Sequence, residues 1–401
     1  MIRHNKARVA MALAFFVATI GFAEAQSAPA ASSAMVEGKR YIVYSDLGLS
    51  RAEGLVARFD ALFELFNAEF RFDAQNMESK LVVRELMDRR LFDEHISRAV
   101  GAPKEDFVYL HYSTPARREL VLFAKDEPEY SASLAHQAFV QFIKAFVKNP
   151  PLWMRDGYAI YFESARWNEA TGLLEFPENL AWLETTKALL ANGALIPIER
   201  LLSLGADESR SLLDVFYPES WALVSFLSKS ADRSWNRLLW DSISALEADA
   251  SLEENQNAVG ALFKSWYGKA EADKAFIAYL DNRKIFSELA KSAAEAYESG
   301  SYAEAKGLFE KARGLNPQSY LPPYYLGLIA YAAGDFAQAE LHYRNALALG
   351  CDAGAGNYAL ALNALALDKK TEAAAFLEAA KSASPERYGA KVDELQPRLQ
   401  P

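Results

Sequence analysis

Residues 133–163 read SLAHQAFVQFIKAFVKNPPLWMRDGYAIYFE, and the interpretation of the whole chain depends on this stretch. Apolar residues recur at helical spacing over about Ser131–Val147, which predicts a helix. Pro150 and Pro151 end that helix, because proline has no N–H and restricts the residue before it. A second helix is predicted over about Trp153–Glu163. We therefore expect two consecutive helices joined by a short turn.

The layout resembles the zinc core of gluzincin metallopeptidases, in particular the peptidase-MA-like domains of bacterial secreted proteins. In that family the pattern is Leu-Ala-His-Glu-x-x-His, a short linker, and then Trp-Leu-x-Glu-Gly-x-Ala-x-Tyr-Phe-Glu. The matching residues here are Leu134-Ala135-His136 and Trp153-x-x-Asp156-Gly157-x-Ala159-x-Tyr161-Phe162-Glu163. The resemblance implies an α+β domain of zincin-like fold, with a small mixed sheet and a helical lobe.

The resemblance also assigns four functional positions, and the chemistry at them is altered. His136 keeps the first ligand position. Gln137 replaces the glutamate that accepts a proton from the metal-bound water, and an amide cannot act as that base. Val140 replaces the second histidine and has no lone pair, and Asp156 replaces the third ligand with a shorter carboxylate. Loss of a general base alone lowers the rate by a factor of about 10²–10⁴. The sequence therefore predicts a pseudopeptidase with a vestigial site and without catalytic residues, metal or cofactor.

Two alternatives stay open for this site. The two helices could be core helices that match the family by chance, with His136 buried and hydrogen-bonded to a neighbour such as Asp156. Alternatively, an active zinc-dependent peptidase could use a rearranged site, made from His95, His111 and His136, or from His136 with Asp156 and Glu163. Zinc is an expected cofactor only in this second case. Glu163 lies two helical turns after Asp156, which argues against both carboxylates reaching one ion.

Composition limits the broad class of the protein. The chain has 401 residues, 51% of them hydrophobic, which is enough for two or three domains with their own cores and excludes a disordered chain. The formal net charge of −10 argues against nucleic acid as a partner. Cys351 is the single cysteine, so no intramolecular disulfide can form.

The first 25 residues are predicted to be a signal peptide. A basic start is followed by the apolar run Val9–Ala23, and Ala23-Glu24-Ala25 offers small residues for cleavage after Ala25. The run is shorter than the roughly 20 residues of a membrane span, and no later stretch reaches that length. We expect an exported chain, periplasmic or secreted, with no membrane span once the signal is cleaved. An uncleaved anchor is the first alternative and a mitochondrial presequence the second.

Residues 26–36 are small and polar and are predicted to be a flexible N-terminus. The peptidase-MA-like domain is expected to span residues 37–283. Ser50 is predicted to cap a helix that runs to about Phe70. Four β-rich runs predict strands: Arg40–Ser45, Lys80–Glu85, Phe107–Tyr112 and Glu119–Phe123. The segment Phe92–Val100 between them is predicted to be a helix.

After Glu163 the domain is predicted to be largely helical. Phe216–Leu227 resembles the Tyr-x-x-Ser-Trp-Ala-Leu-Val helix that follows the metal motif in the family and packs on the site there. The aromatic content of this helix is explained equally well by packing in a core.

The last third of the chain repeats with a period of 34 residues. Small residues recur one period apart at Ala293, Gly327 and Ala361, where the two helices of a unit are expected to cross. The pattern resembles tetratricopeptide repeats. We predict three repeats over residues 286–387, forming an all-α solenoid, and a capping helix or tail over residues 388–401.

The repeat frame predicts a concave groove lined by the first helix of each repeat. Its positions are aromatic or apolar: Tyr297, Tyr324, Leu328, Tyr331, Tyr358, Leu362 and Leu365. The Lys and Asn residues with which some relatives hold a terminal carboxylate are absent from these positions. The expected partner is a protein or peptide with a hydrophobic or extended segment. The open alternative is that the protein's own chain or the neighbouring domain fills the groove.

Together these features predict an exported pseudopeptidase whose repeats bind or scaffold other proteins. The alternatives are an active zinc-dependent peptidase with a rearranged site, and a structural role in envelope organisation in which the old cleft holds a ligand.

Overall fold

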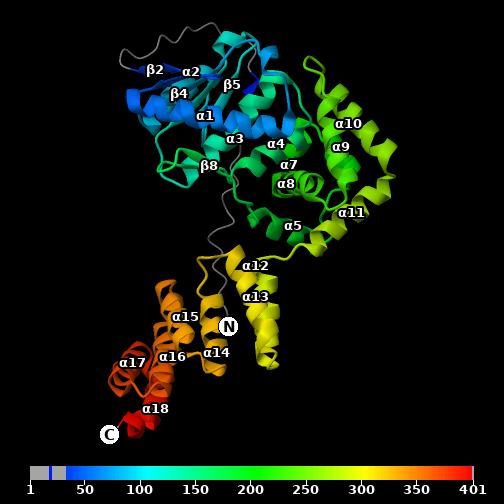
Figure 1. The fold of residues 1–401 in the computed structure, drawn as a ribbon. Coiled ribbons are helices and arrows are strands. Elements are labelled where there is room, and N and C mark those ends of the chain that lie inside the picture. Colours follow the sequence, from blue (N-terminus) through cyan, green and yellow to red (C-terminus); the bar gives the residue numbers. More distant parts are fainter. Residues whose placement is uncertain (1–17, 20–32, 400–401) are drawn as a thin grey trace. The chain divides into compact units, whose positions relative to one another are not determined.

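The computed structural model describes residues 18–19 and 33–399, and the chain divides into two compact units, Met1–Asn282 (unit 1) and Arg283–Pro401 (unit 2) (Figure 1). Except for Ala18–Thr19, the predicted signal peptide lies outside the described residues. The same is true of residues 26–32 in the predicted flexible N-terminus.

Unit 1 begins with a small mixed sheet, as the sequence predicts. The order of its strands is β1-β5-β6-β4-β3-β2. Strands β3, β4 and β6 run parallel to one another, β2 is antiparallel to β3, β5 is antiparallel to β6, and β1 is parallel to β5. The strands are β1 (Ala18–Thr19), β2 (Ala34–Glu37), β3 (Tyr41–Ser45), β4 (Leu81–Leu86), β5 (Val108–His111) and β6 (Glu119–Phe123).

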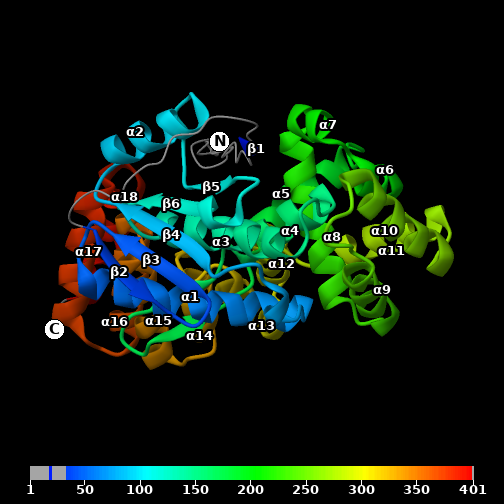
Figure 2. The same ribbon diagram turned by 90° about the horizontal axis from the view of Figure 1, so that it is seen from above.

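Two long helices pack on this sheet. Helix α1 (Leu49–Phe70) contacts β2 and β3, and α3 (Glu129–Phe146) contacts β4, β5 and β6; both lie below the strands in Figure 1. Seen from above, α1 runs alongside β2 and β3 (Figure 2). Helix α2 (Arg89–Val100) packs against β4 and β6. Phenylalanine rings on one side of α1 meet those of α3, as where Phe63 lies 5.1 Å from Phe142 between ring centroids.

Two details of the predicted N-terminal region are wrong. Residues 34–36 belong to β2, because pairing with β3 orders them. Ser50 lies inside α1 and does not cap it; Gly48 precedes the helix with a φ of 99°, a conformation that favours glycine.

A long run of helices follows the sheet. It contains α4 (Leu152–Phe162), α5 (Ala181–Ala191), α6 (Ile198–Ser203), α7 (Ala206–Ser211), α8 (Leu213–Lys229), α9 (Arg233–Ser244), α10 (Leu252–Trp266) and α11 (Lys269–Asn282). The sequence did not predict the hairpin of β7 (Arg166–Asn168) and β8 (Leu173–Glu175), which interrupts the run after α4.

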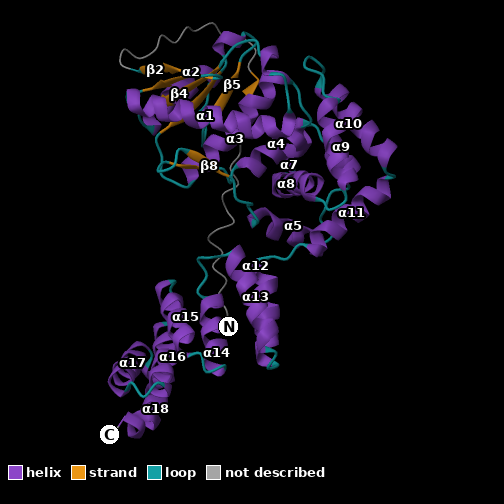
Figure 3. Cartoon of the chain, in the orientation of Figure 1, coloured by secondary structure: helices purple, strands orange, loops and turns teal. Residues whose placement is uncertain are grey.

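Unit 2 is helical throughout its described residues, apart from short turns (Figure 3). Its helices pack in consecutive pairs, α12 with α13, α14 with α15, and α16 with α17. The second helices begin at Tyr302, Phe336 and Lys370, which reproduces the period of 34 residues. The helices are α12 (Phe286–Glu298), α13 (Tyr302–Leu315), α14 (Leu321–Ala332), α15 (Phe336–Ala348), α16 (Ala353–Ala366) and α17 (Lys370–Ala383). This arrangement fits the predicted tetratricopeptide repeats.

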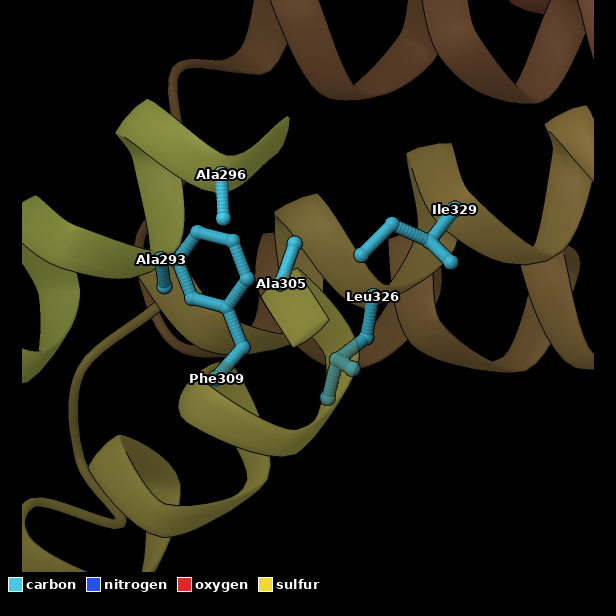
Figure 4. Packing of buried hydrophobic residues seen from close by; sticks show 6 residues of the cluster. All are labelled: Ala293, Ala296, Ala305, Phe309, Leu326 and Ile329. Atoms are coloured by element: carbon cyan, nitrogen blue, oxygen red, sulfur yellow. The ribbon is translucent and has the colours of Figure 1, made fainter. Parts of the chain in front are cut away.

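Small residues meet large ones inside each pair. Figure 4 shows the cluster formed by Ala293, Ala296, Ala305, Phe309, Leu326 and Ile329 from α12, α13 and α14. In the next repeat a Cβ added to Gly327 would lie 2.5 Å from Cε1 of Tyr343, so the glycine makes room for that ring. The predicted role of the small residues at the helix crossings agrees with this packing.

The end of unit 2 differs in detail from the prediction. Helix α18 (Pro385–Leu395) begins at Pro385, three residues before residue 388, because proline suits the first turn of a helix. The buried Tyr388 and Val392 of α18 pack with Ala361 and Leu377. This helix therefore covers the apolar side of the last repeat.

Candidate functional site

Helices α3 and α4 pack against each other and carry the four positions that the resemblance assigns. His136, Gln137 and Val140 lie on α3 and are 1–2% exposed, and Asp156 on α4 is 7% exposed. The structure therefore places all four in the interior of unit 1.

The partner of His136 is Glu163. Nδ1 of His136 lies 2.8 Å from Oε1 of Glu163, where the ring N–H donates to the carboxylate. The suggestion that Asp156 accepts this bond is wrong, because Asp156 is held elsewhere. Nε and Nη2 of Arg155 donate to its two carboxylate oxygens, at 2.6 and 2.8 Å.

Tyr217 of α8 belongs to the same polar cluster. Burial raises the pKa of its hydroxyl, and the negative charges of Asp156 and Glu163 raise it further, whereas Arg155 lowers it. The sequence analysis did not assign a site role to Tyr217, although the motif at Phe216–Leu227 gave a signal for it.

Helices α4 and α8 can cross closely only because residue 157 is glycine. A Cβ at Gly157 would lie 2.5 Å from the carbonyl oxygen of Ser220 and 2.7 Å from its carbonyl carbon. Asp156 thus contributes to the polar cluster, and the neighbouring Gly157 permits the close crossing of α4 and α8.

These residues do not fit a zinc ion. Val140 offers no donor atom, both oxygens of Asp156 accept from Arg155, and Gln137 supplies only a neutral amide. Across residues 18–19 and 33–399, no group of three or more His, Cys, Asp or Glu side chains could hold a metal.

In the described part of unit 1, the two other histidines have partners of their own. Nε2 of His95 is 2.9 Å from Oε1 of Glu119 on β6, and Nδ1 of His111 is 3.2 Å from the hydroxyl of Tyr109 on β5. The suggested site of three histidines is therefore not assembled.

Positive charge surrounds His111. Burial lowers its pKa to about 3, and Lys144, Arg118 and Lys148 lower it in the same direction, so the ring is neutral at physiological pH. Burial and then Arg155 lower the pKa of Lys144 to about 8. Its Nζ donates to the carbonyl oxygen of Lys148, 3.0 Å away, just beyond the end of α3. Lys144 therefore fixes the segment that follows α3 to the last turn of that helix.

A small open hollow lies between the sheet and α3. Gln141 lines this hollow, and its Nε2 donates to the carbonyl oxygen of Val82 at 2.9 Å. Its Oε1 is buried and accepts no hydrogen bond from the described residues. Nη1 of Arg118 is paired with Glu78 at the same hollow, at 3.1 Å. A water molecule satisfies such an amide oxygen as well as a ligand would.

The predicted groove residues all lie on the first helix of a pair in unit 2. We call them the first-helix row, and all seven are half-buried: Tyr297 on α12, Tyr324, Leu328 and Tyr331 on α14, and Tyr358, Leu362 and Leu365 on α16. Tyr324, Leu328 and Tyr331 pack with one edge against a core cluster that contains Tyr343. That the row forms a binding groove stays a prediction.

No family model matches the chain, and no curated protein matches it. Among solved structures, part of the chain is similar to the "First TPR of Spaghetti (RPAP3) bound to HSP90 peptide SRMEEVD". The sequence identity is 22%, the match covers 28% of this chain and 89% of that chain, and the TM-score is 0.27. At this level the similarity does not assign the chain to a family. Within the described residues, no helix has the length and apolar composition needed to cross a membrane.

Proposed function

We propose that the protein is an exported binding protein in which unit 1 is a non-catalytic, peptidase-like scaffold and unit 2 binds a segment of another protein. One observation carries the non-catalytic half of the proposal. Both oxygens of Asp156 are engaged by Arg155, so the surviving carboxylate of the motif has another partner.

Electrostatics supports this interpretation. A zinc ion would have to displace Arg155 from Asp156 inside a buried region, and Val140 would contribute nothing in return. Gln137 could not then activate a water molecule, because an amide does not accept a proton at ordinary pH.

Metal analysis of the full chain tests the proposal. We expect well under one zinc per chain after purification without chelators, and no protease activity. The double variant Gln137→Glu, Val140→His restores the His-Glu-x-x-His pattern and serves as the positive control for metal uptake. One zinc per chain in the unmodified protein, lost in His136→Ala together with peptide cleavage, would favour the rearranged peptidase instead.

The binding half of the proposal rests on unit 2. Paired helices at a period of 34 residues, with an uncharged row along the first helices, are typical of surfaces that bind an apolar segment. The double variant Tyr324→Ser, Leu328→Ser should reduce the capture of apolar decapeptides on a peptide array. Leu341→Ser is the matched control, because Leu341 is 60% exposed on α15 and lies outside the row. Equal capture by all three proteins would contradict a binding role for the row.

Export is proposed from the predicted signal peptide and is tested separately. N-terminal sequencing of the mature protein from an envelope fraction should begin at Gln26. A mature protein that begins at Met1 and stays with the cytoplasmic fraction would contradict export. Cross-linking in the envelope fraction separates a scaffolding role from a purely structural one. In a structural role, the Tyr324→Ser, Leu328→Ser variant keeps the same cross-links to other proteins as the unmodified protein.

A further inference from the structure

Helix α18 brings two positive charges to one end of the first-helix row. Nζ of Lys391 lies 5.8 Å from the ring centroid of Tyr358 and 5.7 Å from that of Tyr388. The guanidinium carbon of Arg387 lies 5.4 Å from the Tyr388 centroid. The rings of Tyr358 and Tyr388 are themselves 5.2 Å apart. The row therefore ends in an aromatic pair with cations beside it, which we call the α18 end.

This end also reaches helix α14. Burial raises the pKa of Tyr324 to about 12, the nearby hydroxyl of Tyr388 adds to that rise, and the positive charge of Arg387 opposes it. Tyr324 therefore lies within the electrostatic reach of Arg387. The α18 end involves residues of α14, α16 and α18.

The two cations have no acidic partner in the described part of the chain. Arg387 and Lys391 are exposed, and neither lies within 4.0 Å of a carboxylate there. Two of the surrounding acids are engaged by other groups: Oδ1 of Asp352 accepts the N–H of Ala355 at the start of α16, and Asp393 is paired with Lys381. The charge on this surface is thus available to a partner.

The rest of the row carries no charge. Its seven side chains are tyrosines and leucines, so they favour apolar or aromatic residues and reject a charged residue that would lose its water there. Charge complementarity is therefore confined to one end of the row, and it gives a bound segment a direction.

We propose that the partner of unit 2 is a protein segment whose apolar residues lie along the row and whose acidic residues meet Arg387 and Lys391 at the α18 end. This inference rests on the proposed function, because it specifies the chemistry of the segment that the row binds. The carboxylates come either from Asp and Glu side chains or from a terminal carboxylate.

Fluorescence anisotropy with labelled synthetic twelve-residue peptides tests the inference on the full chain. Each peptide has nine residues of Leu and Ser followed by three Asp, three Gln or three Lys, and each is made with a free or an amidated C-terminus. We expect the Asp peptides to bind about tenfold more tightly than the Gln peptides at low salt, with the preference lost at high salt. The free and amidated Gln peptides distinguish a terminal carboxylate from side-chain carboxylates.

The double variant Arg387→Glu, Lys391→Glu should remove the preference for Asp and favour Lys. The matched control is Lys306→Glu, Lys311→Glu, which reverses two exposed charges on α13 outside the row and should leave the preference unchanged. Far-UV circular dichroism establishes that both variants keep their helices.

The outcomes separate the inference from the proposed function. Equal binding of the Asp, Gln and Lys peptides, reduced by Tyr324→Ser, Leu328→Ser, would overturn the inference and leave the proposed function standing. An Asp preference that survives the reversal of Arg387 and Lys391 would also overturn the inference. Absence of binding by every peptide would overturn both.

Discussion

Glu219 gives the sharpest quantitative test of the interior of unit 1. Glu219 is 0% exposed on α8, and both of its carboxyl oxygens accept the backbone N–H of Ile196, at 2.9 and 3.1 Å. Burial raises its pKa from 4.5 to about 8, the bond from Ile196 opposes the rise, and the negative charge of Asp273 on α11 adds to it. The side chain is therefore mostly protonated at pH 7.

The sign of the pH dependence follows from this shift. Between pH 4.5 and about 8 the folded chain holds a proton on Glu219 that the unfolded chain has lost, so the free energy of unfolding falls as pH rises through this window. Each pH unit corresponds to about 1.4 kcal/mol. From pH 6 to pH 9 the titration of Glu219 therefore lowers the free energy of unfolding by at most about 3 kcal/mol. Water that enters around the ionised carboxylate reduces this loss to about 2 kcal/mol.

The substitution Glu219→Gln removes the titration and keeps an oxygen for the N–H of Ile196. We expect the variant to unfold within about 1 kcal/mol of the unmodified protein at pH 6, and to be more stable by about 2 kcal/mol at pH 9. All seven tryptophans lie in unit 1, so tryptophan fluorescence during urea unfolding reports this unit without a contribution from unit 2. Other titrating groups, including Lys144, cancel in the difference between the two proteins.

Glu53→Gln is the control, because Glu53 is exposed on α1. Its stability difference from the unmodified protein should stay constant with pH. The reasoning is refuted if Glu219→Gln behaves in the same way, with a difference that changes by less than about 0.5 kcal/mol between pH 6 and pH 9.

Two further predictions use the same fluorescence assay. Gly157→Ala should lower the free energy of unfolding by about 2–4 kcal/mol, because the new Cβ would meet the Ser220 backbone. In the control Gly54→Ala an added Cβ meets nothing within 4 Å, so this variant should raise the free energy of unfolding by about 0.5–1 kcal/mol. Equal effects would contradict the close crossing of α4 and α8. His136→Ala should lower the free energy of unfolding by about 1–3 kcal/mol, because Glu163 loses its buried partner. Glu163→Gln keeps an acceptor for the ring N–H of His136 and should have less than half that effect. The opposite order would show that the pair contributes little.

The elements of unit 1 that could be predicted from sequence are those with a strong local pattern. The apolar spacing along α1 and α3 and the β-rich runs of β3, β4 and β6 identified them within a few residues of their bounds. Strand β2 was missed because its order comes from pairing with β3, which no local signal reveals. The repeats of unit 2 were clear because one pattern recurs in register, and each copy supports the others.

The arrangement within the candidate site was harder to predict than the helices that carry it. Either Asp156 within α4 or Glu163 directly after it could have met His136, and the outcome depends on Arg155, which donates to Asp156. Adjacent residues on a helix point in different directions, so sequence rules give no reason to pair Arg155 with Asp156. Their bond forms because both side chains are buried together and charge inside a protein requires a partner. Glu163 is then the carboxylate left for His136.

Under the proposed function, unit 1 holds α3 and α4 together without a metal ion. A bound ion would join α3 to α4 through ligands from both helices. Here the hydrogen bond from His136 to Glu163 joins the same two helices, and Gly157 lets α8 close on α4. Desolvation offsets most of the attraction in a buried pair, so the pair fixes the register of the helices more than it adds to stability. The fold is instead stabilised by the aromatic packing of α1, α3 and α4, where Phe66 lies 4.7 Å from Phe162 between ring centroids. Under the proposed function, selection then retains His136 for its bond to Glu163, and chelators should leave the stability of unit 1 unchanged.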